Sequence, residues 1–515
     1  MSVSIIINSP LQLHILARKR KITPSAEQSL SKTTLVLATP SKGPSNISQS
    51  STLFIQPFYG PKQMYPSGIA TILNHYTHNH TPPAEKHENE ELWHNRHVLI
   101  PYNLQEQSNN IITDGELCSL LHSIFPGTEN VTEPCFRGYL IFQVKQLPSA
   151  PWPLTVGGLP ITVSETRSGR GRALMFPRAM PGRLSISILQ SGFDGTNMSD
   201  GGLRQLARDV NTYFQLNLPA VHIIELMFTC QHTFFIVIDD HAELKTGEWP
   251  GKIANYPVAY LHDKDLNRPA WIDKPDRRET EPHPSMEIAD DTAYDVLRPG
   301  VMISSSIITG ASHPATLSST AGVLVKNTTG DSFMTAAFHA VGDSERVWQS
   351  RRPAETIGKV AVEIPFTGIC LVKLERSISF SNQTFEINEG IVPQFTRLAT
   401  SGDEFSFSTC YLNSPYTGLL DSVIIAKSIK IQAERTPHSI EERLRYVAYD
   451  WLYHGQEEGN IKAKLPDGMC GSVIWNDEGV IQGFYQFSIK EGSWKGFSAC
   501  VSASEVVESG YTLVA

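Results

Sequence analysis

Apolar positions in the N-terminal half of the chain recur with both helical and strand-like spacing. From Thr113, which with Asp114 can cap a helix, to Ile124, apolar residues lie three and four positions apart and predict a helix. The same spacing predicts a second helix from Gly202 to Gln215. Four apolar runs predict strands, the last two as a hairpin or one bent strand: Tyr139 to Val144, Leu184 to Leu189, Val221 to Phe228 and Thr233 to Ile238. Residues 51–261 are therefore predicted to form an α/β (α+β) module.

The pattern changes around a charged segment. Residues 262–296 include 15 charged residues among 35, together with four prolines, and are predicted to be a linker. From Gly300 onward, short apolar runs alternate with turn residues, and helical spacing nearly vanishes until residues 503–509. This predicts an all-β domain over residues 297–515, built as one large or two small barrels. Residues 1–50, rich in Ser, Thr, Pro and Gly without periodicity, are predicted to be a flexible tail.

Composition excludes several classes of protein and partner. The 515 residues are 40% hydrophobic and 18% charged, which is typical of a folded globular chain and excludes a disordered or fibrous one. The net charge of -9 gives no reason to expect nucleic acid or an anionic membrane as a partner. No apolar run reaches the roughly 18 residues of a membrane-spanning helix. Seven cysteines without a close pair predict free thiols in a reducing compartment.

The N-terminus bears on localisation. The basic run from Arg18 to Lys21 follows the apolar piece Leu11 to Leu16, whereas a secretory signal places its basic residues first. We therefore expect an intracellular, cytoplasmic protein. The basic run also leaves a nuclear address open, and the absence of acidic residues before Glu27 leaves a mitochondrial presequence open.

Two features of the N-terminal half have both a functional and a simpler interpretation. Six of the 17 histidines fall within residues 75–97, with pairs at 75/78 and 94/97 that have metal-ligand spacing. The segment is rich in Pro, Asn and Glu and lacks cysteine, so we interpret it as a solvated loop and expect no metal and no other cofactor. Arg167, Arg170 and Arg172 alternate with glycines, but no helix pattern follows them. A basic hairpin turn is therefore expected there in place of a phosphate-binding loop.

Three segments of the C-terminal half carry candidate chemistry in a fixed order. A strand–turn–strand pattern leads into Thr-Ala-Ala-Phe-His, which ends at His339; an apolar strand follows Gly368; and Asp-Gly-Met-Cys-Gly, with Cys470, precedes a predicted hairpin. The glycines at 468 and 471 permit backbone conformations that a side chain resists. The N–H groups of Gly468 and Cys470 could then form an oxyanion hole. Because a free cysteine has a pKa of about 8.5, the thiol needs an adjacent imidazole to become a nucleophile at neutral pH.

The order of these segments resembles that of chymotrypsin-like proteases. In that family a strand ends in Thr-Ala-Ala-His, with the histidine as general base, and the nucleophile stands in Gly-Asp-Ser-Gly-Gly-Pro. His339 matches the base, with Phe338 inserted before it, and Cys470 takes the nucleophile's place, as in viral chymotrypsin-like cysteine proteases. Residues 297–488 also resemble uncharacterised fungal proteins with an Asp-Gly-x-Cys-Gly-Ser segment. The resemblance covers about two fifths of the chain and implies a double β-barrel that hydrolyses polypeptides with a Cys–His pair.

One departure from the family pattern leaves alternatives open. The aspartate that orients the histidine in the family aligns with Gly368, and Glu363 or Asp343 are candidates to replace it. A Cys–His pair tolerates this loss better than a serine enzyme, because a thiol gives up its proton more easily than a hydroxyl. The alternative is a catalytically inactive pseudoprotease that serves as a peptide-binding or regulatory scaffold. A third interpretation assigns the principal activity to residues 51–261, although they carry no nucleotide or metal signature.

The family's primary specificity pocket has a partial counterpart in the sequence. Family position implies that Tyr485, Gln486 and Phe487 line one wall of that pocket. Viral enzymes that prefer glutamine have a histidine in this wall, and this run has none. Lys464 could project an ammonium into the pocket and favour an acidic side chain, but a solvated lysine is the simpler interpretation.

Overall fold

The computed structural model describes residues 96–102, 104, 115–132, 138–148, 152–172, 179–189, 198–243, 245–269, 290–307, 315–341, 346–385, 393–405, 407, 409–434, 443–455, 465–466 and 468–515. The chain divides into Met1–Phe54 and Ile55–Ala515, and every described residue belongs to the second unit. Several predictions fall outside the described residues: the tail, five of the six clustered histidines, much of the linker, Asp343 and Lys464.

A mixed sheet with one helix is formed by residues 96–172. Its order is β1-β4-β5-β3-β2, with β6 beside β5: β1 His97–Val98, β2 Thr128–Thr132, β3 Leu140–Val144, β4 Thr155–Val156, β5 Leu159–Glu165 and β6 Gly171–Arg172. Helix α3, Gly115–Ile124, confirms the first predicted helix and buries its apolar stripe. The antiparallel β5 and β6 are joined by a turn in which the Glu165 N–H donates to the Arg170 carbonyl at 2.7 Å. The predicted basic hairpin turn is thereby confirmed.

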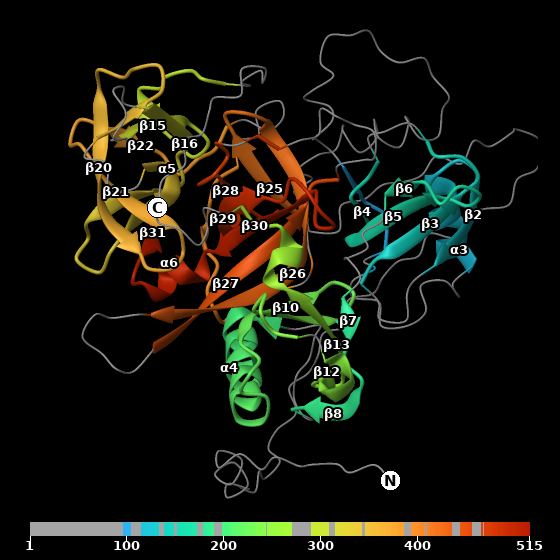
Figure 1. Cartoon of the computed structure of the whole chain (residues 1–515). Coiled ribbons are helices and arrows are strands. Elements are labelled where there is room, and N and C mark those ends of the chain that lie inside the picture. Colours follow the sequence, from blue (N-terminus) through green and yellow to red (C-terminus); the bar gives the residue numbers. More distant parts are fainter. Residues whose placement is uncertain are drawn as a thin grey trace, which may run out of the picture. The chain divides into compact units, whose positions relative to one another are not determined.

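A thirteen-stranded sheet combines strands from both halves of the chain (Figure 1). Its order is β25-β28-β29-β30-β27-β26-β10-β11-β13-β12-β8, with β23 beside β29 and β7 beside β13. The strands from the N-terminal half are β7 Met180–Pro181, β8 Leu184–Ile188, β10 Ile223–Thr229, β11 Phe234–Ile238, β12 Pro250–Ile253 and β13 Tyr256–His262. Antiparallel pairing of β10 with β11 confirms the predicted hairpin. On its other edge β10 pairs with β26, Gly418–Glu434, from Glu225 opposite Lys430 to Thr229 opposite Ala426.

The pairing of β10 with β26 crosses the predicted boundary between the N-terminal module and the C-terminal domain. The two strands lie on opposite sides of the charged segment, yet they share one ladder of main-chain hydrogen bonds. A separate N-terminal α/β module is therefore not confirmed, and the boundaries at residues 261 and 297 stay a prediction. The N-terminal half also contains more strand than expected, with two short 3-10 turns, η1 Thr246–Glu248 and η2 Asp263–Leu266.

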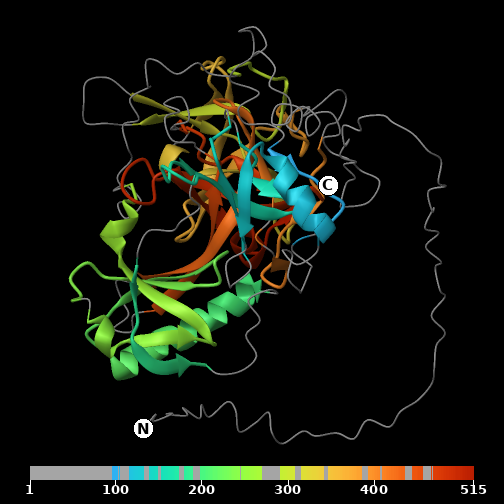
Figure 2. The ribbon, with the colours of Figure 1, turned by 90° about the vertical axis from the view of Figure 1, so that its right-hand side faces the viewer.

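Helix α4, Asp200–Asn217, covers the part of this sheet where the two halves meet. It confirms the predicted helix and is longer by two residues at each end. Its first residue is set by Ser199, which caps the helix by accepting a hydrogen bond from the Gly202 N–H at 3.1 Å. Its apolar face packs with β10, β11, β13, β26 and β27 in one core cluster. Figure 2 shows α4 extending along the green strands of the sheet. No helix of the described residues is long and apolar enough to span a membrane.

Two six-stranded units of identical order make up the C-terminal half. The first contains β15 Met302–Ile307, β17 Leu324–Lys326, β18 Ser332–Ala337, β19 Val347–Gln349, β20 Thr356–Ile364 and β21 Ile369–Leu374, with β16 Ala315–Thr320 as a hairpin partner of β15. The second contains β25 Thr409–Ser414, β26, β27 Arg443–Tyr453, β28 Val473–Trp475, β29 Val480–Ser488 and β30 Phe497–Ser502. In both, the spatial order is first, fourth, fifth, sixth, third and second strand.

The second unit closes on itself. Strand β25 pairs with β28 and also with β26, so its six strands form a barrel. The remaining elements are short: β9 Met198–Ser199 with β24 Glu404–Phe405, β14 Val296–Leu297 with β22 Ser379–Phe380, β23 Arg397–Leu398, α5 Phe338–Val341, α6 Ser504–Glu508 and β31 Thr512–Leu513. The described residues after 297 are mostly strands, with only the short helices α5 and α6, in agreement with the predicted all-β character.

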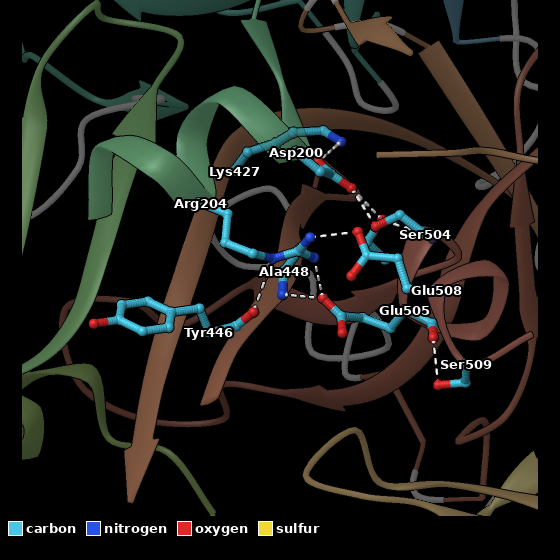
Figure 3. Close-up of polar contacts among 10 residues, drawn as sticks. Asp200, Arg204, Lys427, Tyr446, Ala448, Ser504, Glu505, Glu508 and Ser509 are labelled. Carbon is cyan, nitrogen blue, oxygen red and sulfur yellow. Dashed lines mark hydrogen bonds and ion pairs between the residues drawn. The ribbon is translucent and has the colours of Figure 1, made fainter. Parts of the chain in front are cut away.

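A buried polar cluster joins α4 to the barrel formed by the second unit (Figure 3). The Lys427 ammonium lies 2.9 Å from a carboxylate oxygen of Asp200, the first residue of α4, and 2.9 Å from one of Asp450 on β27. The other Asp200 oxygen accepts from the hydroxyls of Ser502 at 2.5 Å and Ser504 at 2.7 Å. These contacts hold the first turn of α4 against β26, β27 and the start of α6.

One turn further along α4, an arginine makes the corresponding link to α6. The Arg204 guanidinium pairs with Glu505 at 2.7 Å and with Glu508, and it donates to the Tyr446 carbonyl at 2.9 Å (Figure 3). Glu505 also accepts from the Ala448 N–H of β27 at 2.7 Å. The helix is thus tied to the barrel by main-chain and side-chain contacts as well as by its apolar face.

Candidate functional site

His339 lies between the third and fourth strands of the first unit, on the single turn of α5. The Phe338 N–H donates to the Gly368 carbonyl at 2.8 Å, and the Ser305 hydroxyl donates to the Ala340 carbonyl at 2.7 Å. The two bonds fix α5 on either side of the half-buried His339. Phe338, which departs from the family pattern in the sequence, is thus the residue that joins α5 to the turn carrying Gly368.

Cys470 occupies the equivalent place in the second unit, between its third and fourth strands. Donors at the end of β16 bind two carbonyl groups of this turn. The Thr320 hydroxyl donates to the Gly468 carbonyl at 3.0 Å. The Cys470 carbonyl accepts from the Ser319 hydroxyl at 2.7 Å and from the Thr320 N–H at 3.1 Å. Cys470 is 8% exposed, and its thiol donates to the Gln486 carbonyl at 2.9 Å.

The two candidate segments are in direct contact. Gly471, which follows Cys470, has a φ of +88°, and a Cβ there would lie 2.6 Å from the Thr320 carbonyl oxygen and 3.1 Å from the Ala337 nitrogen. Ala337 is the last residue of β18 and stands two positions before His339. The structure therefore brings the backbones that carry His339 and Cys470 together, although they are far apart in the sequence.

The expected oxyanion donors stand at the start of the same turn. Gly468 has a φ of +100°, and within the described residues its N–H makes no hydrogen bond. The phenol of Tyr416 lies 2.4–2.6 Å from where a Cβ at position 468 would stand, and this close approach together with the positive φ favours glycine there. Nothing in the sequence pattern marked Tyr416, which lies in the turn between β25 and β26. The assignment of Gly468 and Cys470 as oxyanion donors stays a prediction.

The structure does not strengthen the assignment of Glu363 or Asp343 as the carboxylate that orients His339. Glu363 is exposed on β20, opposite Cys370 of β21, and partial burial raises the pKa of its carboxyl. Asp343 lies outside the described residues. The space beside Gly368 is occupied instead by Gln486, because a Cβ at position 368 would lie 2.7 Å from the Gln486 side-chain oxygen.

Tyr485, Gln486 and Phe487 are consecutive residues of β29, and all three are buried. Phe487 packs edge-to-face against Trp451, with ring centroids 6.2 Å apart, in a core cluster that also contains residues of β10, β11 and β13. The Tyr485 N–H and carbonyl flank the Cys470 turn, pairing with the Ser472 carbonyl at 2.9 Å and the Gly471 N–H at 2.8 Å. Their role as a pocket wall stays a prediction, and the structure adds that this strand supports the Cys470 turn.

Replacing Gly471 by Ala tests how tightly this turn is held. We expect a loss of stability greater than the roughly 1–2 kcal/mol that positive φ alone costs, because the new Cβ meets the Thr320 carbonyl and the turn must move. Gly330→Ala is the matched control, since Gly330 has a φ of +87° and open space around it. Thermal unfolding and the alkylation rate of Cys470 are the measurements. Equal effects of the two substitutions would contradict a tightly held turn.

Comparisons with known proteins give a limited likeness. No protein-family model matches the chain, and no curated protein matches it. Similar solved structures include a glutamic acid specific serine protease that uses a histidine triad in substrate binding (14% identity, TM-score 0.31, 42% of this chain and 100% of that one). A Nocardiopsis protease is 13% identical, with a TM-score of 0.29 over 43% of this chain and 100% of that one. Thermobifida fusca protease A is also 13% identical, with a TM-score of 0.29 over 42% of this chain and 98% of that one. The cysteine nucleophile and the viral or fungal relatives stay predictions.

Proposed function

We propose that residues 297–515 form a cysteine peptidase that cleaves polypeptides with Cys470 as nucleophile and His339 as base. The observation that carries the proposal is the meeting of the two segments: His339 and Cys470 follow the third strand of two units with the same strand order, and Gly471 lies against Ala337. Neither a metal nor an organic cofactor is needed for this chemistry.

The proposed reaction proceeds in two stages. His339 accepts the thiol proton of Cys470, and the thiolate forms a bond to the carbonyl carbon of the peptide. The N–H groups of Gly468 and Cys470 stabilise the resulting oxyanion, to which each donor contributes about 2.7–4 kcal/mol in comparable sites. Collapse breaks the C–N bond while His339 protonates the leaving amine. Water, deprotonated by His339, then hydrolyses the thioester and restores the thiol.

The proposed attack requires one rearrangement. The Cys470 thiol now donates to the Gln486 carbonyl, and this bond must break when the proton moves to His339. A thiolate 2.9 Å from a carbonyl oxygen is repelled by it, so the sulfur is expected to rotate away from β29 as it becomes charged.

The alkylation rate of Cys470 as a function of pH tests the proposed pair. Iodoacetamide labelling, quantified by peptide mass spectrometry, is expected to have its midpoint well below pH 8.5, the approximate value for a free cysteine. The midpoint should rise towards that value in His339→Ala and stay unchanged in His241→Ala, which alters an exposed histidine. A slow, ordinary profile that is indifferent to His339 would contradict the peptidase proposal.

The alternative function is a peptide-binding or regulatory scaffold with an inactive site. Gly368 favours it, because the family's orienting aspartate is missing. The same labelling experiment separates the two functions, since an inactive scaffold needs no interaction between His339 and Cys470. Screening a peptide library for cleavage by the wild-type chain and by Cys470→Ala then measures the activity itself.

A further inference from the structure

Tyr416 packs its phenol against Gly468, at the start of the turn that carries Cys470. The hydroxyl oxygen and two ring carbons of Tyr416 lie 2.4, 2.5 and 2.6 Å from where a Cβ at position 468 would stand, and they are the three nearest atoms from elsewhere in the chain. Glycine at 468 lets the ring approach the backbone this closely, because it has no Cβ. One of the two expected oxyanion donors is therefore in direct contact with a side chain from the turn between β25 and β26.

The backbone on either side of the half-buried Tyr416 is held by hydrogen bonds. The Ser414 hydroxyl accepts from the Tyr416 N–H at 3.3 Å and from the Thr417 N–H at 3.1 Å. The Pro415 carbonyl accepts from the Asp290 N–H at 2.9 Å, which ties this turn to the segment before β14. The phenol therefore projects towards Gly468 from a turn that is fixed on both sides.

Gly468 is held from a second direction as well. Its carbonyl accepts from the Thr320 hydroxyl at 3.0 Å. Because its φ is +100°, the N–H of Gly468 points away from the Cβ position, and so away from the phenol on that side. The Tyr416 ring thus supports Gly468 from behind and does not cover the side to which the N–H is directed.

We propose that the Tyr416 ring holds Gly468 in the conformation that aims its N–H at the oxyanion. This inference rests on the proposed peptidase function. It makes Tyr416 a positioning residue, since the ring acts through Gly468 and not on the reacting atoms.

The need for such a ring follows from the properties of glycine. An oxyanion donor is most effective when it is oriented before the charge develops, because reorientation during the reaction costs free energy. Glycine has the widest range of backbone conformations, so Gly468 would lose this orientation easily. A side chain at 468 could not provide the restraint, because it would be strained at positive φ. A ring supplied by another turn restricts the backbone without that strain.

The test compares two reactions of Cys470, of which only one forms an oxyanion. With p-nitrophenyl acetate, the thiolate forms a bond to the acetyl carbon, an oxyanion develops, and p-nitrophenolate leaves. With iodoacetamide, the thiolate displaces iodide and no oxyanion forms. In Tyr416→Ala we expect acetylation to slow at least roughly tenfold, while the rate and pH midpoint of alkylation stay as in the wild type. Both rates are measured on the Cys470 peptide by mass spectrometry, with Cys470→Ala giving the background release of p-nitrophenolate.

Three further variants show which property of Tyr416 matters. Tyr416→Phe keeps the ring and should retain most of the acetylation rate. Tyr416→Leu has a side chain too short to reach Gly468 and should be as slow as Tyr416→Ala, so it is the deciding variant if Tyr416→Ala does not fold. Tyr213→Ala removes another half-buried tyrosine, on α4, and is the matched control that should leave both rates unchanged.

The outcomes separate this inference from the function on which it rests. Wild-type acetylation in Tyr416→Ala and Tyr416→Leu, with both reactions slowed in His339→Ala, would overturn the role of Tyr416 and leave the peptidase proposal standing. Acetylation in Tyr416→Phe as slow as in Tyr416→Ala would also overturn positioning by the ring. If His339→Ala leaves both reactions of Cys470 unchanged, the peptidase proposal itself fails.

Discussion

Lys427→Met should lower the free energy of unfolding by about 3–5 kcal/mol, because it leaves two buried carboxylates without their cation. Burial alone would lower the pKa of Lys427, but Asp200 and Asp450 raise it above its usual value. The two acids differ in pKa. The pKa of Asp200 is lowered, whereas burial raises the pKa of Asp450 to about 6 in spite of the nearby ammonium. Without Lys427, one of the carboxylates must take up a proton or the contact of α4 with the barrel must open.

The same substitution at the surface provides the control. Lys373 pairs with Asp331 at 2.7 Å, but both side chains are largely exposed, and Lys373→Met should cost no more than about 1 kcal/mol. Adding Asp450→Asn to Lys427→Met should recover part of the loss, since it removes one of the stranded charges. Urea titration followed by tryptophan fluorescence measures all four proteins. A loss at Lys427 no larger than at Lys373 would show that the buried triad contributes little to stability.

Acidification from pH 7 to pH 5 should destabilise the fold through two buried histidines. Burial, followed by the charge of Arg96, lowers the pKa of His97 to about 3, and burial lowers the pKa of His454 to about 3 as well. In the unfolded chain a histidine titrates near pH 6.5, so below that pH the unfolded state binds more protons and gains stability. The expected loss by pH 5 is about 2 kcal/mol for each histidine, and it continues as the pH falls towards 3.

Comparison of two double variants isolates this effect from other titrating groups. His97→Gln with His454→Gln should flatten the dependence of unfolding free energy on pH between 7 and 5. His222→Gln with His241→Gln, which changes two exposed histidines, should leave it as in the wild type. Parallel slopes for all three proteins would mean that the two buried imidazoles take up protons between pH 7 and 5 in the folded state as they do in the unfolded chain, contrary to the pKa values above.

Local features of the fold followed from the sequence. Helical spacing located α3 and α4 to within two residues, and turn residues located the β17–β18 and β28–β29 hairpins. Apolar runs located β10 and β11 but left a hairpin and one bent strand as alternatives. The order of His339, Gly368 and Cys470 suggested a shared site, and the structure brings their backbones together. Each of these inferences depends on neighbours in the chain or on a family pattern.

Contacts between distant segments did not follow from the sequence. Strand β10 consists mainly of large apolar residues, which indicates that it is buried but not which strand lies beside it. The charged run after β13 suggested a boundary, although the sheet continues through β26. Gln486 is another case, because its position beside Gly368 depends on the packing of β29 against the turn between β20 and β21. The periodicity of apolar residues indicates whether a side chain is buried, but it does not indicate which distant residue that side chain contacts.

Because the two halves of the chain share one sheet, they are expected to stay associated after a cut between them. A single cut in the charged segment would separate β13 from β14 in the covalent chain, but the β10–β26 ladder and the ion pairs of Lys427 and Arg204 would still join the two fragments. The two halves are thus suited to reassembly as a split protein. A C-terminal half prepared alone would expose one edge of its longest strand, β26, and leave Lys427 without Asp200, so its missing partner is the other half of its own chain.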